Sequence, residues 1–220
     1  SIEEGSIDHL SWIAEGNEIN SPDSILYAYQ TWGNVLMTLI PLSDHGCTDT
    51  LIQSILVHPA PILVLTIGNN CFGDMTELVG SSTVPLGSIT QEVWTPGDGS
   101  PSVSGNAVDH YYETANTYSP TFTAYSDEGC IASVNEDIII YPLADPLFIV
   151  EPSKICAEAH VFFTDLSVVS SPYYVNAWSW YLGDSLFSNA PNPVASFDSP
   201  GTYNLTLQVS TNMGCVSDTL

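Results

Sequence analysis

The 220-residue chain almost lacks basic side chains. Lys154 is its one Lys or Arg, against 25 Asp and Glu, which gives a formal net charge of −24. Because phosphate binding depends on Lys and Arg, we expect no nucleic-acid partner. No apolar run reaches the length of a membrane span, so we also expect no membrane insertion. The charge suits a soluble chain whose surfaces repel one another.

Helical periodicity is also missing from the sequence. Short runs of alternating apolar residues are separated by turns rich in Gly and Pro, of which there are 15 each. This pattern is typical of β-strands joined by tight turns. Hydrophobic residues make up 44% of the chain, enough for a core in each of several small domains. The sequence therefore predicts an all-β protein.

Three Gly-Cys dipeptides mark an internal repeat. They end at Cys47, Cys130 and Cys215, at intervals of 83 and 85 residues. Counting back from each cysteine, a Trp stands 35 or 36 residues earlier, and an aromatic or apolar residue 12 residues earlier opens an alternating strand. We expect the tryptophans and the strand-opening tyrosines to be core residues at equivalent positions. These are Trp12, Trp94, Trp180, Tyr118 and Tyr203.

Proline-rich segments separate the copies. Residues 59–61 and 142–146 act as short, stiff linkers. We therefore predict a partial repeat over 1–59 that lacks its opening strands, a complete repeat over 60–144, and a repeat over 145–220 truncated in its last strand. The principal partners of each repeat are then the neighbouring repeats of one long chain, arranged as an extended rod.

The five cysteines follow the same repeat. Cys71 and Cys130 are 59 residues apart, and so are Cys156 and Cys215. Equal spacing predicts the same pairing in both copies, Cys71–Cys130 and Cys156–Cys215, and leaves Cys47 unpaired by truncation. Such disulfides place the protein outside the cytosol. Free or metal-binding thiols are the alternative, but no Cys or His pair has zinc spacing.

The third copy reads W-S-W-Y-L-G-D over 178–184 and P-G-T-Y-N-L-T-L over 200–207. The second copy keeps W-T-P-G-D-G over 94–99, and the first copy is degenerate. These segments resemble the polycystic-kidney-disease (PKD) domain, whose patterns are W-x-F-G-D-G and P-G-x-Y-x-V-x-L. The resemblance implies an immunoglobulin-like sandwich of two antiparallel sheets, and a tandem array of them in this chain.

Cysteine-stapled PKD-like repeats with few basic residues resemble those of very long surface proteins of gliding and filamentous Bacteroidetes-type bacteria. The resemblance implies a secreted, cell-surface protein that acts as an adhesin or stalk in gliding motility. Asp-Ser/Thr-aliphatic triplets resemble the O-glycosylation signal of these bacteria, although chance occurrence in a Ser/Thr-rich chain is the alternative. The candidate glycosylation sites are Ser24, Thr50, Ser185 and Thr219.

No constellation of catalytic residues is apparent. The five His have no metal-ligand spacing, and no nucleophile-elbow motif is present. We therefore expect no catalytic residues and no enzyme activity. Ca²⁺ is the one cofactor considered, with Asp98 and Asp184 after the Trp strand and Asp145 in the second linker as candidate ligands. A purely structural role in turns is the alternative for these residues.

Three functions remain open at this stage. The chain can be a stalk, spacer or adhesin segment, or a subunit of an extracellular filament or sheath that is completed by strands from a neighbour. It can also be an accessory module of a secreted hydrolase that binds surface polysaccharide. The last function needs an aromatic platform, for which Trp32, Tyr173 and Tyr174 are the candidates.

Overall fold

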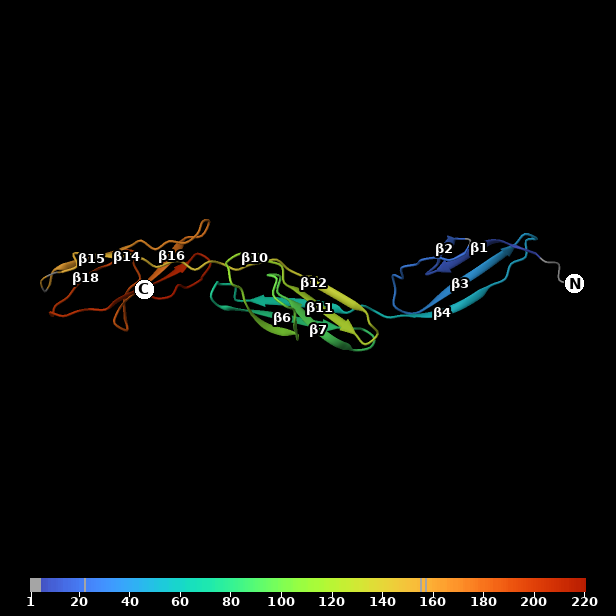
Figure 1. The fold of residues 1–220 in the computed structure, drawn as a ribbon, viewed down its shortest axis with the longest axis horizontal. Helices are drawn as coiled ribbons and strands as arrows, with labels where there is room; N and C mark the ends of the chain where they lie inside the picture. The colour runs from blue at the N-terminus through green and yellow to red at the C-terminus, as the bar shows by residue number, and fades with distance from the viewer. Residues whose placement is uncertain (1–4, 22, 155, 157) are drawn as a thin grey trace. The chain divides into compact units, whose positions relative to one another are not determined.

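The structure is a computed structural model that describes residues 5–21, 23–154, 156 and 158–220. These residues form nineteen strands in six sheets and contain no helix (Figure 1). The predicted all-β class is therefore confirmed.

The first part of the chain forms one four-stranded sheet. Its order is β2-β1-β3-β4, with β1 (Ile7–Ala14), β2 (Asn17–Asn20), β3 (Gly33–Ser43) and β4 (Leu51–Val57). Trp12 in β1 lies opposite Leu39 in β3, eight residues before the Gly-Cys cysteine. Trp12 is only half-buried, in contrast to the predicted core position, because the described residues before Val57 form a single sheet.

The middle part contributes three sheets. The first has the order β5-β6-β9, with β5 (Ile62–Gly68), β6 (Met75–Thr83) and β9 (Ala107–Tyr111). The second has the order β12-β11-β7-β8, with β7 (Ile89–Thr95), β8 (Val103–Ser104), β11 (Thr121–Ser126) and β12 (Ile131–Asn135). The third pairs β10 (Thr117–Tyr118) with β13 (Ile138–Ile139).

Burial in the middle part follows the alternation of the sequence. Phe122 and Ala124 in β11 are fully buried, and their neighbours along the strand are half-exposed. Trp94 is also fully buried, with its ring 5.0 Å from that of Phe122. Phe122 stands eight residues before its Gly-Cys cysteine, like Leu39 in the first copy.

The last part consists of two three-stranded sheets. One has the order β14-β15-β18, with β14 (Phe148–Glu151), β15 (His160–Asp165) and β18 (Val194–Ser196). The other has the order β17-β16-β19, with β16 (Val175–Leu182), β17 (Ser185–Ser188) and β19 (Leu205–Thr211). Their inner faces share one core around Trp180, as expected for an immunoglobulin-like sandwich. Trp180 lies opposite Leu207, again eight residues before the Gly-Cys cysteine.

By packing, the chain divides into two compact units that differ from the three predicted repeats. The first unit holds 1–64, 81–92 and 123–133, and the second holds 65–80, 93–122 and 134–220. Strands of the middle part continue from one unit into the other. The repeats 1–59, 60–144 and 145–220 are used below as divisions of the sequence, and their independent folding stays a prediction.

Candidate functional site

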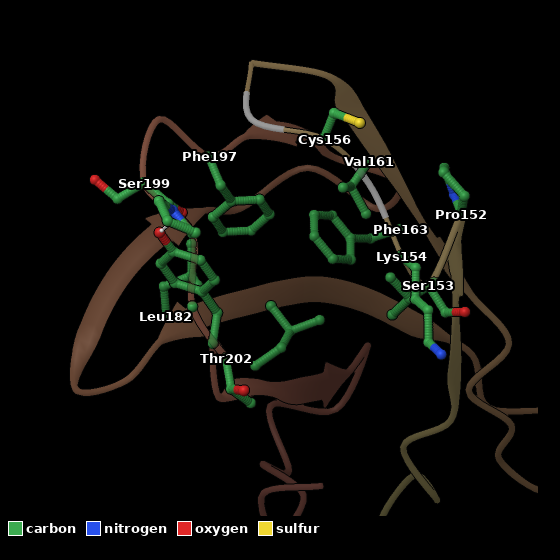
Figure 2. Close-up of a pocket in the computed structure, with 15 residues that line it drawn as sticks. Pro152, Ser153, Lys154, Cys156, Val161, Phe163, Leu182, Phe197, Ser199 and Thr202 are labelled. Carbon is green, nitrogen blue, oxygen red and sulfur yellow. Dashed lines mark hydrogen bonds between the residues drawn. The ribbon is translucent and has the colours of Figure 1, made fainter.

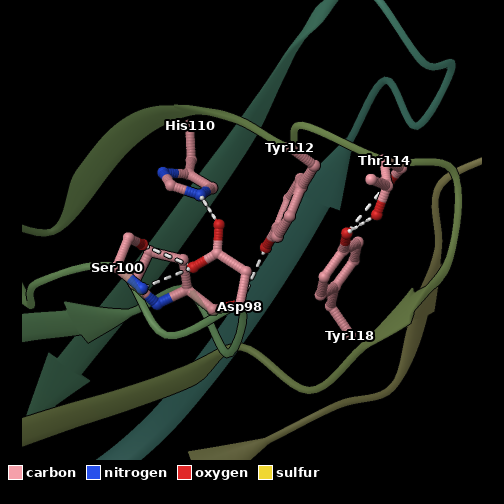
Figure 3. Close-up of polar contacts among 7 residues, drawn as sticks. Asp98, Ser100, His110, Tyr112, Thr114 and Tyr118 are labelled. Carbon is pink, nitrogen blue, oxygen red and sulfur yellow. Dashed lines mark hydrogen bonds and ion pairs between the residues drawn. The ribbon is translucent and has the colours of Figure 1, made fainter.

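A polar cluster lies where β7 turns toward β8. Asp98 stands between Gly97 and Gly99, whose φ angles of 87° and 91° are readily adopted by glycine alone. The Asp98 carboxylate accepts hydrogen bonds from the backbone N–H and the hydroxyl of Ser100. Its other oxygen lies 2.8 Å from Nε2 of His110 in β9 (Figure 3). A cavity of about 530 Å³ opens beside these side chains.

These contacts hold Asp98 in its charged form. Burial alone would raise the pKa of Asp98, but the hydrogen bonds from Ser100 and His110 outweigh burial and lower the pKa to about 2. The Asp98 side chain is only 16% exposed. Asp98 is therefore a shielded carboxylate that ties the turn to β9.

Asp98, Ser100 and His110 are the residue types of a hydrolytic triad, but their contacts differ from those of a triad. In a triad the serine hydroxyl bonds to the histidine, which in turn bonds to the aspartate. Here the Ser100 hydroxyl and the His110 ring both bond to the Asp98 carboxylate. The histidine is not placed to take the serine proton, so the arrangement favours a structural role.

We expect Asp98→Asn to lower the free energy of unfolding at pH 7 by about 1–2 kcal/mol, because charge-assisted hydrogen bonds are lost. Since the folded pKa of Asp98 lies below its ordinary value, its contribution is present above about pH 4 and is lost as the pH falls toward 2. Urea titrations across this range should show the wild-type and variant stabilities converging at low pH.

Asp184→Asn is the matched control, since Asp184 occupies the equivalent turn but its carboxylate accepts no hydrogen bond from the described residues, whereas Asp98 bonds to Ser100 and His110. This substitution should leave stability at pH 7 unchanged within about 0.5 kcal/mol. A loss from Asp98→Asn that is equally large at pH 2 and pH 7 would contradict the role of the Asp98 charge.

A tyrosine contact recurs in two repeats. The Tyr118 hydroxyl donates to the carbonyl of Thr114 at 3.0 Å, and the Tyr203 hydroxyl donates to the carbonyl of Ser199 at 2.8 Å. Both bonds reach back four residues and resemble the tyrosine corner of sandwich domains. Tyr118 is half-buried and stacks on Tyr112, whereas Tyr203 is 44% exposed and not the predicted core residue.

The candidate Ca²⁺ ligands do not come together. In the described ranges, no three His, Cys, Asp or Glu side chains lie close enough to hold a metal ion. The backbone of Asp145 exchanges two hydrogen bonds with Val168. Ala195 takes the place of His110 in the third repeat, so the turn at Asp184 lacks that partner. The acidic residues thus stand as turn and bridge residues.

The four candidate glycosylation residues all lie on the surface: Ser24, Thr50, Ser185 and Thr219. Of the candidate platform aromatics, Trp32 is 57% and Tyr174 60% exposed, and they belong to different compact units. Tyr173 packs edge-on against Tyr141, with ring centroids 5.6 Å apart. Tyr173 therefore serves packing in the second unit.

The disulfide differs from both predicted pairs. Cys71 bonds to Cys215, with their Cα atoms 5.4 Å apart, so the pairings Cys71–Cys130 and Cys156–Cys215 are wrong. Equal sequence spacing identifies equivalent positions, but a disulfide requires Cα atoms within about 7 Å. Cys130 belongs to the other compact unit from Cys71. Cys47, Cys130 and Cys156, all within the described residues, are free thiols.

An apolar cavity of about 790 Å³ opens in the third repeat. Figure 2 shows Phe163, Leu182 and Phe197 pointing into it, with Cys156 and Lys154 at its edge. The residue pattern did not predict this cavity. Such a concave apolar surface can hold an apolar ligand or a polypeptide segment.

Part of the chain matches a known protein family. Residues 143–220 match the family model of the PKD domain. No curated protein sequence matches the chain. The described residues contain no helix long and apolar enough to cross a membrane.

Similar solved structures share low identity with the chain. The PKD1 domain of Vibrio anguillarum Epp is 18% identical, with a TM-score of 0.35, over 38% of this chain and 95% of that domain. The fibronectin(III)-like modules of Clostridium thermocellum CbhA are 10% identical, with a TM-score of 0.42, over 71% of this chain and 90% of theirs. The family match and the facing sheets support PKD-like repeats, and with the disulfide they indicate an extracellular chain.

Proposed function

We propose that the chain is a non-catalytic segment of a secreted cell-surface protein, in which PKD-like repeats act as a stalk or adhesin. The observation that carries this proposal is the Cys71–Cys215 bond, which joins the second repeat to the third. A covalent link between successive repeats suits a chain that must bear load or resist proteolysis outside the cell.

Ordered contacts at the second linker favour the same function. Ala144 is 4% exposed and belongs to the core of the third repeat. Asp145 is fixed to Val168 by two backbone hydrogen bonds, and Tyr141 packs on Tyr173. A junction held in this way transmits orientation from repeat to repeat, which a flexible linker does not.

The surface chemistry suits a long extracellular array. With a net charge of −24, neighbouring faces repel one another, and association between chains is disfavoured. The four exposed Asp-Ser/Thr-aliphatic sites support O-glycosylation of a Bacteroidetes-type adhesin or gliding-motility protein. Intact mass measurement of the protein from its native cells tests this: each Ser or Thr to Ala substitution should remove the mass of one glycan.

Small-angle scattering tests the stalk. A compact domain of this length would have a radius of gyration of about 17 Å. We expect a value well above that, unchanged by a calcium chelator, because proline linkers and charge repulsion favour extension. A radius close to that of a compact domain would overturn the stalk, and a change on chelation would restore Ca²⁺ as a clamp between repeats.

A second candidate function is favoured by the cavity of the third repeat. A filament or sheath subunit that accepts a strand from a neighbour needs an open apolar groove beside unpaired backbone. The cavity of about 790 Å³ is largely apolar, and Thr202 and Tyr203 in its lining lie outside the described strands. Sedimentation of the purified chain distinguishes the candidates, because a filament subunit assembles with rising concentration and a stalk segment does not.

A further inference from the structure

We propose that the cavity beside the polar cluster of the second repeat binds an arginine side chain of another protein. The cavity of about 530 Å³ lies between the turn after β7 and the segment that begins at the end of β9 (Figure 3). Its lining residues all fall within 98–118, in one repeat and in one compact unit. The site is therefore built by a continuous stretch of the second repeat.

The lining carries negative charge and contains no Lys or Arg. Burial opposes the charge on Asp98, but hydrogen bonds from Ser100 and His110 lower the pKa of its carboxyl to about 2. Glu113 is exposed, and its carboxylate has no hydrogen-bond partner among the described residues. An anionic ligand is thus repelled from the cavity, and a cationic ligand is attracted.

The hydroxyl protons of the lining are used within the lining itself. The Ser100 hydroxyl donates to the Asp98 carboxylate, and the Tyr118 hydroxyl donates to the carbonyl of Thr114 at 3.0 Å (Figure 3). The hydroxyl oxygens of Thr114 and Tyr118 lie 2.7 Å apart, so the Thr114 proton occupies that contact. These three hydroxyls keep acceptor lone pairs but have no proton left for a ligand.

His110 adds a further acceptor. Its Nε2 lies 2.8 Å from the Asp98 carboxylate and carries the proton of the neutral ring, which leaves a lone pair on Nδ1. Within the part of the chain that the structure describes, Nδ1 has no hydrogen-bond partner. Together with the oxygens of Glu113, the cavity offers a ligand several acceptors, so a ligand that fits must bring its own donors.

A guanidinium group matches this set of acceptors. It is always charged and carries five N–H donors in one plane, with no acceptor of its own. Its flat face also stacks on aromatic rings, and two tyrosines line the cavity. Tyr111 is 44% exposed and Tyr118 is half-buried. A metal ion fits less well, since no three His, Cys, Asp or Glu of the described ranges lie close enough to hold one.

The arginine has to come from a different protein. The one basic residue of the sequence is Lys154, so a second copy of these 220 residues has no arginine to offer. The net charge of −24 repels other copies and attracts a basic partner over a long range. The third repeat does not duplicate the site, because Ala195 stands in the place of His110.

An NMR titration of the 220-residue chain tests the site. The probe is the acetylated and amidated tripeptide Gly-Arg-Gly in about 50 mM salt, where charges are only partly screened. We expect saturable shifts at Ser100, His110 and Tyr118. The control peptide has citrulline in place of arginine, with the same shape but no charge, and should bind about tenfold more weakly. Equal binding of the two peptides, or shifts that do not saturate, would overturn the proposal.

Two charge variants separate the cavity from the overall charge of the chain. Glu113→Gln removes a charge from the lining and should weaken binding of the arginine peptide about fivefold. Glu151→Gln removes the same charge at an exposed position outside the lining and should leave binding unchanged. If both variants weakened binding equally, the peptide would be responding to net charge alone, and the site would be refuted.

Tyr111→Leu tests the aromatic wall of the cavity. The substitution keeps an apolar side chain on β9 but removes the ring face, and it should weaken binding of the arginine peptide about threefold. Tyr174→Leu is the control, since Tyr174 is 60% exposed but does not line the cavity. Tighter binding of glucosamine or of the tripeptide Gly-Lys-Gly than of the arginine peptide would assign the cavity to a primary ammonium group, contrary to the proposal.

Discussion

Cys71→Ser is expected to lower the free energy of unfolding of the chain by about 2–5 kcal/mol, because the bond that it removes closes a loop of 144 residues in the unfolded state. Cys71 is the better position to replace, since Cys215 is fully buried and a serine there would add a buried hydroxyl. Urea denaturation without reductant measures the loss. A reductant added to the wild-type chain should reproduce it.

Cys130→Ser is the matched control. Cys130 has the same turn as Cys215 but carries no disulfide, so the substitution should change stability by less than about 0.5 kcal/mol. Equal losses from Cys71→Ser and Cys130→Ser would contradict the observed pairing and favour a bond within the second repeat. An unchanged wild-type midpoint in reductant would show that the bond does not stabilise the fold.

The sequence was sufficient to predict the all-β fold class. Alternate residues of β11 and β19 are buried, among them Phe122 and Leu207, as expected for the alternating strands that open at Tyr118 and Tyr203. In each copy the tryptophan lies next to the residue that stands eight positions before the Gly-Cys cysteine. Trp12 and Trp180 lie opposite theirs on the neighbouring strand, and the ring of Trp94 packs against that of Phe122. These features are local, because strand period and turn residues are fixed by neighbours in the chain.

The pairing of the cysteines could not be predicted from the sequence, because a disulfide depends on the distance between two residues in space. The separations of 59 and 144 residues both respect the repeat, and spacing alone cannot choose between a bond within one repeat and a bond between two. Cys71 bonds across the second linker, where Ala144 enters the core of the third repeat. A prediction of this bond requires knowing how that linker is packed.

The polar cluster shows a second limit of the sequence. Gly97-Asp98-Gly99 was recognisable as a turn, but His110 lies twelve residues away on another sheet and has no counterpart in the third repeat. Pairing across the sandwich brings it to Asp98. The signal in the sequence was that His110 occurs in the second copy alone. The histidine can be related to Asp98 only once the register between β6 and β9 is known.

Trp180→Ala is expected to lower the free energy of unfolding by about 3–5 kcal/mol and to make the unfolding of the second compact unit less cooperative. Trp180 is fully buried, with ring centroids 5.2 Å from Phe148 and 5.8 Å from Phe163. Its indole N–H donates to the carbonyl of Ala190 at 2.9 Å. The alanine leaves a cavity between the sheets and removes this hydrogen bond. Urea unfolding followed by near-UV circular dichroism measures both effects.

Two further variants separate the causes. Trp180→Phe keeps most of the packing but leaves the Ala190 carbonyl without its donor, so its cost should be about 1–3 kcal/mol. Trp32→Ala removes the same side chain at a position that is 57% exposed and should cost less than about 1 kcal/mol. If Trp32→Ala proved as destabilising as Trp180→Ala, burial between the two sheets would not explain the effect of Trp180→Ala. The conclusion that Trp180 is the centre of the third-repeat core would then be wrong.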